Sequence, residues 1–265
     1  MTSEQSDEPT GQESSTPAAR ARSRRRLPPG AEVGIVLVAA VLLAVVVKVF
    51  FVQAFYIPSI SMAPGLRDDD KIVVEKWSYW SGEPQRGDVV VFSDPGGWLN
   101  PGEVEDPSNI LTETMAKIGL YPSGGHLVKR VIGVPGDVIK CCDDQGRLII
   151  NGVAVDESDY VFDDKRVHGC RGPMTGNCAW KAGPVPQGTV FVMGDNRGKS
   201  ADSTVHLCLE DETDCVAGHE FVPDSDIVGK VWRILLPFDR AGSVSSDSEV
   251  FAQVPDRSDD APKAP

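Results

Sequence analysis

The chain has 265 residues, of which 41% are hydrophobic and 25% are charged, and its formal net charge is −13 at pH 7. This length allows one sizeable folded domain with tails. The acidic balance argues against nucleic acid as a partner, because binding to phosphates requires a basic face. The basic cluster "RARSRRR" at 20–26 lies next to an apolar run, so we interpret it as a signal for membrane orientation.

The amino-terminal part of the chain predicts a membrane anchor. Residues 1–30 are rich in Ser, Glu, Pro and Arg, which is typical of a disordered tail. The predicted span at 31–52 contains a run of about 20 apolar residues at 33–52, enough to cross a bilayer as a helix and interrupted by one charge, Lys48. The arginines before this run predict a cytoplasmic amino terminus in a bacterial cell membrane, with everything after the span outside the cytoplasm. A buried core helix and a signal peptide that is clipped near Ala54 are the competing interpretations.

The remainder of the chain predicts a mainly β domain. Residues 53–239 contain short β-branched runs that are separated by Gly, Pro and Asp, as in linked short strands. An insertion at 106–120 has the apolar spacing of a helix. Residues 240–265 have the polar composition of the amino-terminal tail, so we expect a second disordered tail there.

The six cysteines suit an oxidising exterior. Cys170 and Cys178 flank one short polar loop, and Cys208 and Cys215 flank another, so either loop can be closed by a disulfide. Pairing among six cysteines is formally ambiguous, and the adjacent Cys141 and Cys142 have no obvious partners. Metal binding is the competing interpretation, but there is no C-x-x-C pair and the histidines are scattered. We therefore expect no metal and no cofactor.

The segment "IPSISMAPGL" at 57–66 follows the apolar run and contains a candidate nucleophile, Ser61. Its two prolines predict an extended or turned backbone, where a serine usually stabilises a turn. A serine becomes a nucleophile only if a nearby base removes its proton. None of the four histidines stands in a convincing triad pattern.

A different base is offered by "HLVKRVIGVPGD" at 126–137, where Lys129 lies in a strand-like apolar run. The two-residue period of a strand places Lys129 on the same face as Leu127 and Val131. Burial there lowers the pKa of the amine from about 10.4 and can leave it neutral near pH 7–8. A protective lysine on an exposed edge strand is the competing interpretation.

A third segment, "MGDNRGKSADST" at 193–204, reads as a tight loop between two strands. The order of these three segments after a membrane span resembles bacterial type I signal peptidases, from the span to about Leu236. The resemblance implies Ser61 as nucleophile, Lys129 as general base and Ser59 as an oxyanion donor beside the Ser61 N–H. It also implies that Ser200 orients the lysine and that supporting roles belong to Asp202, Arg130 and Asp195.

The function that the resemblance implies is a membrane-anchored serine endopeptidase with a Ser/Lys dyad. It would remove N-terminal signal peptides from exported preproteins after small residues (A-x-A), without a cofactor. Its partners would be preproteins emerging from the translocation machinery and the lipid bilayer, and no nucleic acid. Shallow substrate pockets are expected from apolar residues near the dyad, namely Phe55, Ile57, Met62, Leu66, Ile72, Leu127 and Val128.

Two positions depart from the family pattern. Gly65 stands where a threonine is usual, which is expected to loosen the turn, and Thr204 stands where an arginine is common. Any Asp–Arg pair that braces the loop must therefore be absent or rebuilt. The acidic insertion "CLEDETDC" at 208–215 has no assigned role.

Three alternatives to this function follow from the same residues. A self-cleaving SOS repressor has a similar Ser/Lys core but carries a DNA-binding domain in place of a membrane span. An organellar inner-membrane peptidase is related, although the long tails and the cysteines favour a bacterial cell surface. A non-enzymatic, membrane-tethered β-domain would not react with a probe for active serines.

Overall fold

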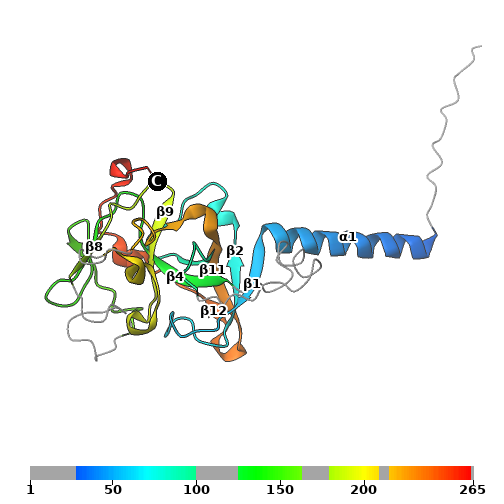
Figure 1. Ribbon diagram of the computed structural model, residues 1–265. Coiled ribbons are helices and arrows are strands. Elements are labelled where there is room, and N and C mark those ends of the chain that lie inside the picture. Colours follow the sequence, from blue (N-terminus) through cyan, green and yellow to red (C-terminus); the bar gives the residue numbers. More distant parts are fainter. Residues whose placement is uncertain (1–27, 100–124, 163–178, 209–214, 264–265) are drawn as a thin grey trace, which may run out of the picture. The chain divides into compact units, whose positions relative to one another are not determined.

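The computed structural model describes residues 28–99, 125–162, 179–208 and 215–263 (Figure 1). They form two compact units that divide between Leu42 and Leu43 in the sequence. The predicted helical insertion at 106–120 lies outside the described residues.

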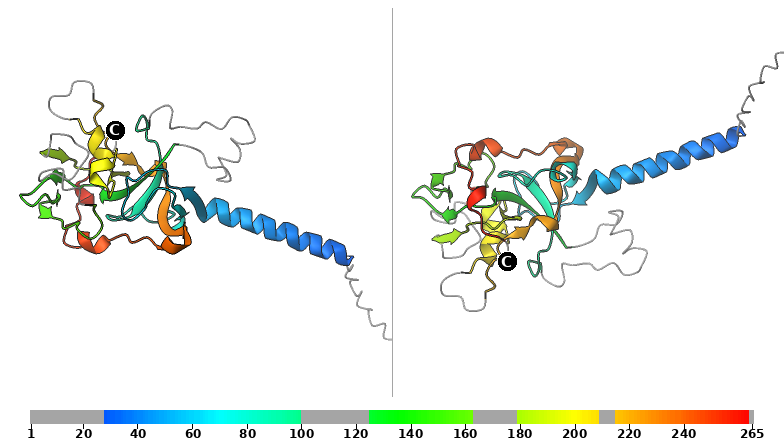
Figure 2. Two further views of the ribbon diagram at one scale, coloured as in Figure 1. Left: turned by 90° about the horizontal axis from the view of Figure 1, so that it is seen from below. Right: turned by 90° about the horizontal axis from the view of Figure 1, so that it is seen from above.

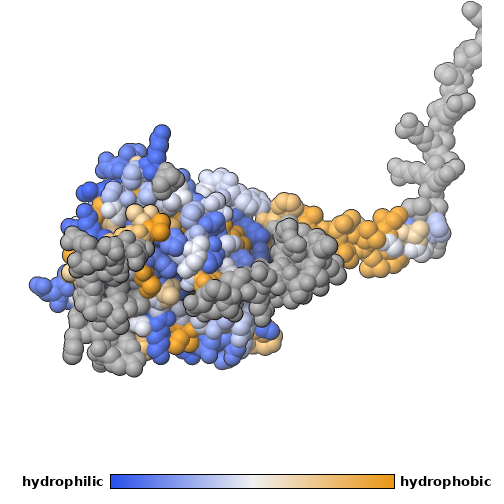
Figure 3. Space-filling model, in the orientation of Figure 1, coloured by the Kyte–Doolittle hydropathy of each residue, from blue (hydrophilic) through white to orange (hydrophobic). Residues whose placement is uncertain are grey.

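The amino-terminal helix α1 extends over Pro29–Phe50. Its segment Gly30–Val47 is long and apolar enough to cross a membrane, and none of it is buried by the protein. The surface of this helix is hydrophobic along its length (Figure 3). A helix suits such a segment because it satisfies its own backbone hydrogen bonds in lipid. Strand β1 begins at Val52, so the helix ends two residues before the predicted boundary.

The larger sheet has eight strands, in the order β1-β2-β11-β3-β4-β9-β10, with β12 paired to β11. Its strand pairs among the described residues are all antiparallel. The central strand β3 is a continuous apolar run and is buried on both faces over its first four residues. The strand bounds are β1 Val52–Tyr56, β2 Lys71–Glu75, β3 Val89–Ser93, β4 His126–Gly133, β9 Thr189–Met193, β10 Val222–Pro223, β11 Ile227–Leu236 and β12 Gly242–Ser243.

A smaller sheet of four strands has the order β7-β6-β5-β8. Its strands are β5 Ile139–Cys141, β6 Ile149–Ile150, β7 Val153–Ala154 and β8 Trp180–Ala182. The prediction of a mainly β fold after one apolar helix is confirmed. Short 3-10 helices lie in the connections: η1 Trp77–Tyr79, η2 Arg197–Lys199, η3 Ser203–His206, η4 Asp224–Asp226, η5 Phe238–Arg240, η6 Ser248–Phe251 and η7 Ser258–Asp260.

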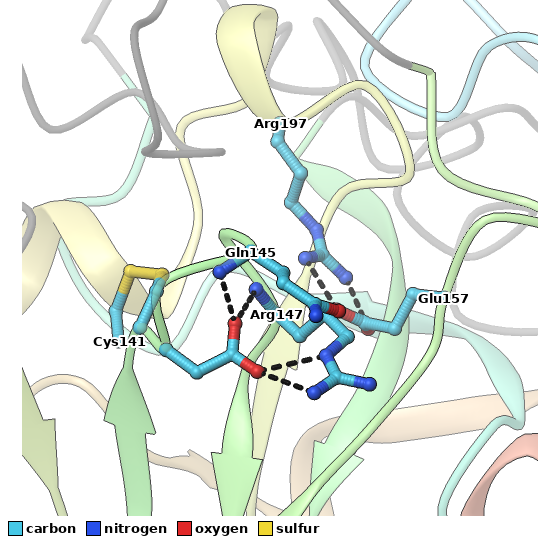
Figure 4. Close-up of a disulfide and its surroundings, with 7 residues drawn as sticks. Cys141, Gln145, Arg147, Glu157 and Arg197 are labelled. Atoms are coloured by element: carbon cyan, nitrogen blue, oxygen red, sulfur yellow. Dashed lines mark hydrogen bonds and ion pairs between the residues drawn. A yellow bond between two sulfur atoms is a disulfide. The ribbon is translucent and has the colours of Figure 1, made fainter.

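Two disulfides are present among the described residues. One joins Cys208 to Cys215, as the spacing predicts. The other joins the neighbours Cys141 and Cys142 at the end of β5, a pairing that the sequence reasoning did not make (Figure 4). Cys170 and Cys178 lie outside the described residues.

The prediction of a disordered carboxyl-terminal tail is wrong for the described residues up to Lys263. Strand β12 pairs with β11, and the chain then continues across the domain from β11 toward the smaller sheet (Figure 2). Phe251 and Val254 are buried in the core with 4% and 7% of their surface exposed. Their burial was missed because a few apolar residues in a polar stretch are too sparse to predict an ordered element from composition. The long-range contacts of these two side chains order the segment.

The burial of Phe251 gives a testable prediction for stability. Phe251→Ala is expected to lower the free energy of unfolding by about 3–5 kcal/mol, because it empties a site in the core. Urea unfolding of the detergent-solubilised chain measures this change. The matched control is Phe238→Ala, since Phe238 is 85% exposed. Equal effects of the two substitutions would show that the tail does not contribute to the core.

Candidate active site

The segment that carries Ser61 is a turn held down by apolar residues. Ile57, Met62 and Leu66 are each at most 2% exposed and belong to one core cluster. The Leu66 N–H donates to the Met62 carbonyl at 2.9 Å, which closes the turn around the nucleophile. Ser61 itself is 7% exposed, so its hydroxyl is held close to the interior.

Lys129 lies in β4, opposite Val90 of β3, and is 4% exposed. Its Nζ is 3.0 Å from Ser61 Oγ, which is hydrogen-bonding distance between residues 68 positions apart in the chain. On the other side of the nucleophile, Ser59 Oγ lies 3.1 Å from Ser61 Oγ. The structure therefore brings together the three residues that the resemblance places at the reaction centre.

Burial controls the protonation of this amine. Loss of water around Lys129 lowers its pKa to about 8, although the carboxylates of Asp202 and Asp195 act in the opposite direction. At pH 7.4 about one amine in five is then neutral, against roughly one in a thousand at the ordinary value. Lys129 can thus accept a proton at physiological pH, which an exposed lysine rarely does.

Arg130, the next residue of β4, holds the loop that faces the dyad. Its Nε and Nη2 each donate to Asp195 at 2.8 Å, and its guanidinium lies 4.2 Å from the centre of the Tyr160 ring. Asn196, the residue after Asp195, donates its backbone N–H to the Ser61 carbonyl at 2.9 Å. The Nδ2 group of Asn196 also donates to the Ile60 carbonyl at 3.1 Å. Arg130 is thereby connected through this loop to the backbone of the nucleophile.

The brace formed by Asp202 is rebuilt without an arginine. Its Oδ2 accepts the Gly194 N–H at 2.9 Å, and its Oδ1 accepts the Thr204 hydroxyl at 2.7 Å and the Thr204 N–H at 3.1 Å. Thr204, the residue that departs from the family pattern, therefore supplies the missing partner with a neutral hydroxyl. Asp202 lies close enough to Lys129 to act against the lowering of its pKa by burial.

Ser200 does not contact the lysine in the way that the resemblance implies. Its side chain is 2% exposed, and its hydroxyl has no hydrogen-bond partner among the described residues. Gly194 allows Ser200 to lie this close to the nucleophile. A Cβ on Gly194 would overlap both the Ser200 hydroxyl and the Ser61 carbonyl.

A buried ion pair behind the loop was missed by the sequence reasoning. Arg197 Nη1 and Nη2 donate to Glu157 at 2.9 and 2.6 Å, and both residues are at most 4% exposed (Figure 4). Arg197 Nε also donates to the Gly194 carbonyl at 3.0 Å, which fixes the end of β9. In the sequence, the signal for this ion pair was an arginine that directly follows Gly-Asp-Asn in a predicted turn. Its partner is 40 residues away in an irregular polar stretch and could not be identified from a pattern.

The predicted pocket residues divide between two core clusters. Leu127 packs in a different cluster from the others, because neighbouring side chains of β4 point to opposite faces. The other six lie in or against a single cluster, namely Phe55, Ile57, Met62, Leu66, Ile72 and Val128.

No histidine competes for the role of base among the described residues. His206 stacks on Trp98 with ring centres 4.4 Å apart, and His126 packs against Phe55 at 5.2 Å. His219 lies against the His206 ring, and His168 is outside the described residues. A buried hydroxyl beside a buried amine is the arrangement by which a serine hydrolase can use lysine as its base.

Comparisons with known proteins agree with the assignment of this chain to the serine hydrolases. The family model for "Signal peptidase, peptidase S26" matches residues 30–236. A signal peptidase I of Mycobacterium tuberculosis (strain ATCC 25618 / H37Rv) is 36% identical over 230 residues, covering 81% of this chain and 75% of that protein. A signal peptidase I of Bacillus licheniformis is 32% identical over 188 residues, covering 70% of this chain and 84% of that protein. The chain belongs to the S26 family of signal peptidases and is a membrane-anchored serine peptidase.

The close approach at Gly194 gives a prediction with an internal control. Gly194→Ala is expected to lower peptidase activity at least about tenfold, because the added methyl must displace the nucleophile segment or Ser200. Gly65→Ala is the control, since its Cβ would meet neighbours only at 3.6 and 3.7 Å, and activity should stay within about twofold. Equal activity of the two variants would contradict the packing described for this loop.

Proposed function

We propose that this chain removes N-terminal signal peptides from exported preproteins by cleavage after small residues in an A-x-A pattern, with Ser61 as nucleophile and Lys129 as base. The observation that carries the proposal is the 3.0 Å contact of Lys129 Nζ with Ser61 Oγ in a buried site that lowers the pKa of the amine to about 8. Relatives named signal peptidase I support the substrate class.

The reaction begins when Ser61 Oγ attacks the carbonyl carbon of the scissile bond and Lys129 takes the hydroxyl proton. The negative charge moves to the carbonyl oxygen, where the Ser59 hydroxyl and the Ser61 N–H can donate to it. One donor of this kind is typically worth about 2.7–4 kcal/mol. Lys129 then returns the proton to the leaving amine, which leaves an acyl-enzyme on Ser61. Water activated by Lys129 hydrolyses this ester.

Two further groups stabilise the protonated form of Lys129. The unpartnered hydroxyl of Ser200 is available to accept a hydrogen bond from the ammonium. Asp202 lies near enough to favour the positive charge, and its hydrogen bonds to Gly194 and Thr204 fix its position. Both groups stabilise the state in which the amine has just accepted the serine proton.

The substrate binds as an added strand beside Phe55–Ile57 and Leu127–Lys129. Strand β9 pairs with β4 only from Arg130 onward, so the first half of β4 lacks a β9 partner along that edge. Strand β1 is the terminal strand of the larger sheet. An extended peptide can pair with such edges through its backbone. Ile57, Met62, Leu66 and Ile72 are almost entirely buried while Phe55 and Val128 are half-buried, which supports shallow pockets that accept small side chains such as alanine.

The helix α1 places this chemistry at a membrane. The arginines before α1 support a cytoplasmic amino terminus and a catalytic domain outside the cytoplasm of a bacterial cell. A domain at that position meets preproteins as they leave the translocation machinery.

Removal of either member of the dyad tests the proposal. Ser61→Ala and Lys129→Ala are each expected to lower cleavage of a purified model preprotein at least about 10³-fold, because each removes a group that takes part in bond breaking. The chain should remain folded by circular dichroism. Lys140→Ala, at an exposed lysine of β5, is the control and should cleave normally. Near-normal cleavage by either dyad variant would refute the mechanism.

The pH dependence of cleavage provides a second test. The neutral amine is the active form, so kcat/KM should rise about tenfold per pH unit below the pKa of Lys129 and level off above about pH 8. An amine in water would instead keep the rate rising to about pH 10. A profile of that second shape, measured with the same preprotein, would show that Lys129 is hydrated in the working enzyme.

A further inference from the structure

The carboxyl-terminal segment Arg240–Lys263, called the strap here, lies beyond the residues that the family model matches. It follows β11 and crosses the domain to the smaller sheet (Figure 2). Its path is held by buried side chains rather than by a long strand, since β12 has only two residues. Two of its charged side chains contact the segments that carry the dyad.

The first contact is made by Arg240 with the turn that carries the nucleophile. Its Nε and Nη2 donate to the Asp70 carboxylate at 3.0 and 2.9 Å, and Nη2 also donates to the Gly65 carbonyl at 3.0 Å. Asp70 is 1% exposed, and its carbonyl accepts the Ile57 N–H at 2.9 Å. Arg240 thus contacts the part of the loop that follows Ser61, and Asp70 connects this part to Ile57, which precedes Ser61. This contact also explains why Gly65 does not leave the turn loose.

The second contact is made with Arg130, the neighbour of Lys129. Arg130 Nη1 lies 3.1 Å from the Asp247 carboxylate and donates to the carbonyls of Ser246 at 3.1 Å and Ser245 at 3.3 Å. The strap can approach closely because residue 87 is a glycine with a φ of +92°, where a Cβ would overlap the Ser246 carbonyl. The same Arg130 holds Asp195 and, through Asn196, the Ser61 backbone.

The part of the strap from Phe251 onward is anchored to the domain, which holds the residues that make these two contacts in place. Phe251 and Val254 are buried in the core. The Pro255 carbonyl accepts from Asn151 Nδ2 at 2.9 Å and from Arg86 Nη2 at 3.2 Å. The segment between Arg240 and Phe251 is therefore attached at both ends.

We propose that the strap is a positioning element of the active site, in which Arg240 holds the Ser61 turn and Asp247 holds the Lys129 strand through Arg130. The inference rests on the proposed function and deepens it. The dyad joins two segments far apart in sequence, and an error of about 1 Å between reacting groups can cost about 10²-fold in rate. Arg240 and Asp247 are not expected to touch substrate, and both act through the residues they bind.

A purely stabilising role for the strap makes a different prediction. Arg240 and Asp247 are each more than one-fifth exposed at the side chain, but their partners Asp70 and Arg130 are at most 3% exposed, so loss of either ion pair can also lower the stability of the fold. A stabilising role would therefore change the number of folded molecules, whereas a positioning role changes the rate of each folded molecule. The two roles are separated by counting active sites.

The experiment uses the full chain in detergent with the variants Arg240→Lys and Asp247→Asn. Arg257→Lys and Asp259→Asn are matched controls at exposed positions of the strap. The burst of nitrophenol from a nitrophenyl ester of a short alanine peptide counts the serines that are acylated. Cleavage of a model preprotein is then expressed as kcat per counted site.

The expected result is a kcat per site that is about 5- to 20-fold lower in both strap variants, with KM within about twofold of wild type. The two controls should match wild type. Asp247→Glu should recover at least about half of the lost rate, because it restores a carboxylate to Arg130. The same fold-changes are expected in the rate of acylation by the ester.

Two results would overturn the inference: a kcat per site equal to that of the controls, or fewer active sites with an unchanged rate at each. Failure of the proposed function gives a different pattern. If the wild type is acylated by the ester but does not cleave the preprotein, the substrate assignment is wrong and the acylation rates still decide the role of the strap. A wild type that the ester does not acylate would refute both proposals.

Discussion

The structure depends on keeping one amine away from water while a hydroxyl lies 3.0 Å from it. Lys129 loses hydration on a strand at the centre of an antiparallel sheet, and that loss opposes two nearby carboxylates. Desolvation is the larger effect, since the pKa is lowered to about 8 despite both negative charges. In the proposed mechanism the carboxylates stabilise the ammonium that forms, so burial favours the amine before the proton transfer and the negative charges favour the ammonium after it.

The loop 194–204 lies beside Lys129 and Ser61 and is held in place by side chains that bind one another. Asp195 is paired with Arg130, and Arg197 is paired with Glu157, so these two charged residues of the loop each bind a group of opposite charge. Buried pairs of this kind contribute more to a defined geometry than to net stability. Replacement of the usual arginine by Thr204 follows the same logic, because a hydroxyl satisfies Asp202 without adding a charge near Lys129.

Much of this arrangement could be predicted from the sequence. Each apolar run that predicts a strand contains one in the structure, and the order of the motifs indicates which serine and lysine meet. The sequence reasoning missed contacts made by polar side chains across long separations, as in Arg197 with Glu157 and Arg240 with Asp70. Charged pairs leave no periodic signal. The prediction of a disordered carboxyl-terminal tail was wrong for a related reason. Composition alone does not reveal that Phe251 packs into a core formed by other segments.

The burial of Phe251 and Val254 near the carboxyl terminus bears on how the enzyme matures. A chain made from its amino end acquires the nucleophile and the amine long before these two side chains emerge. Until then its core is incomplete, and we expect Lys129 to be more hydrated, with a pKa closer to that of an ordinary lysine. On the proposed mechanism, a nascent or stalled chain would therefore have little peptidase activity, and activity would begin only when the last part of the polypeptide has been made and has folded onto the core.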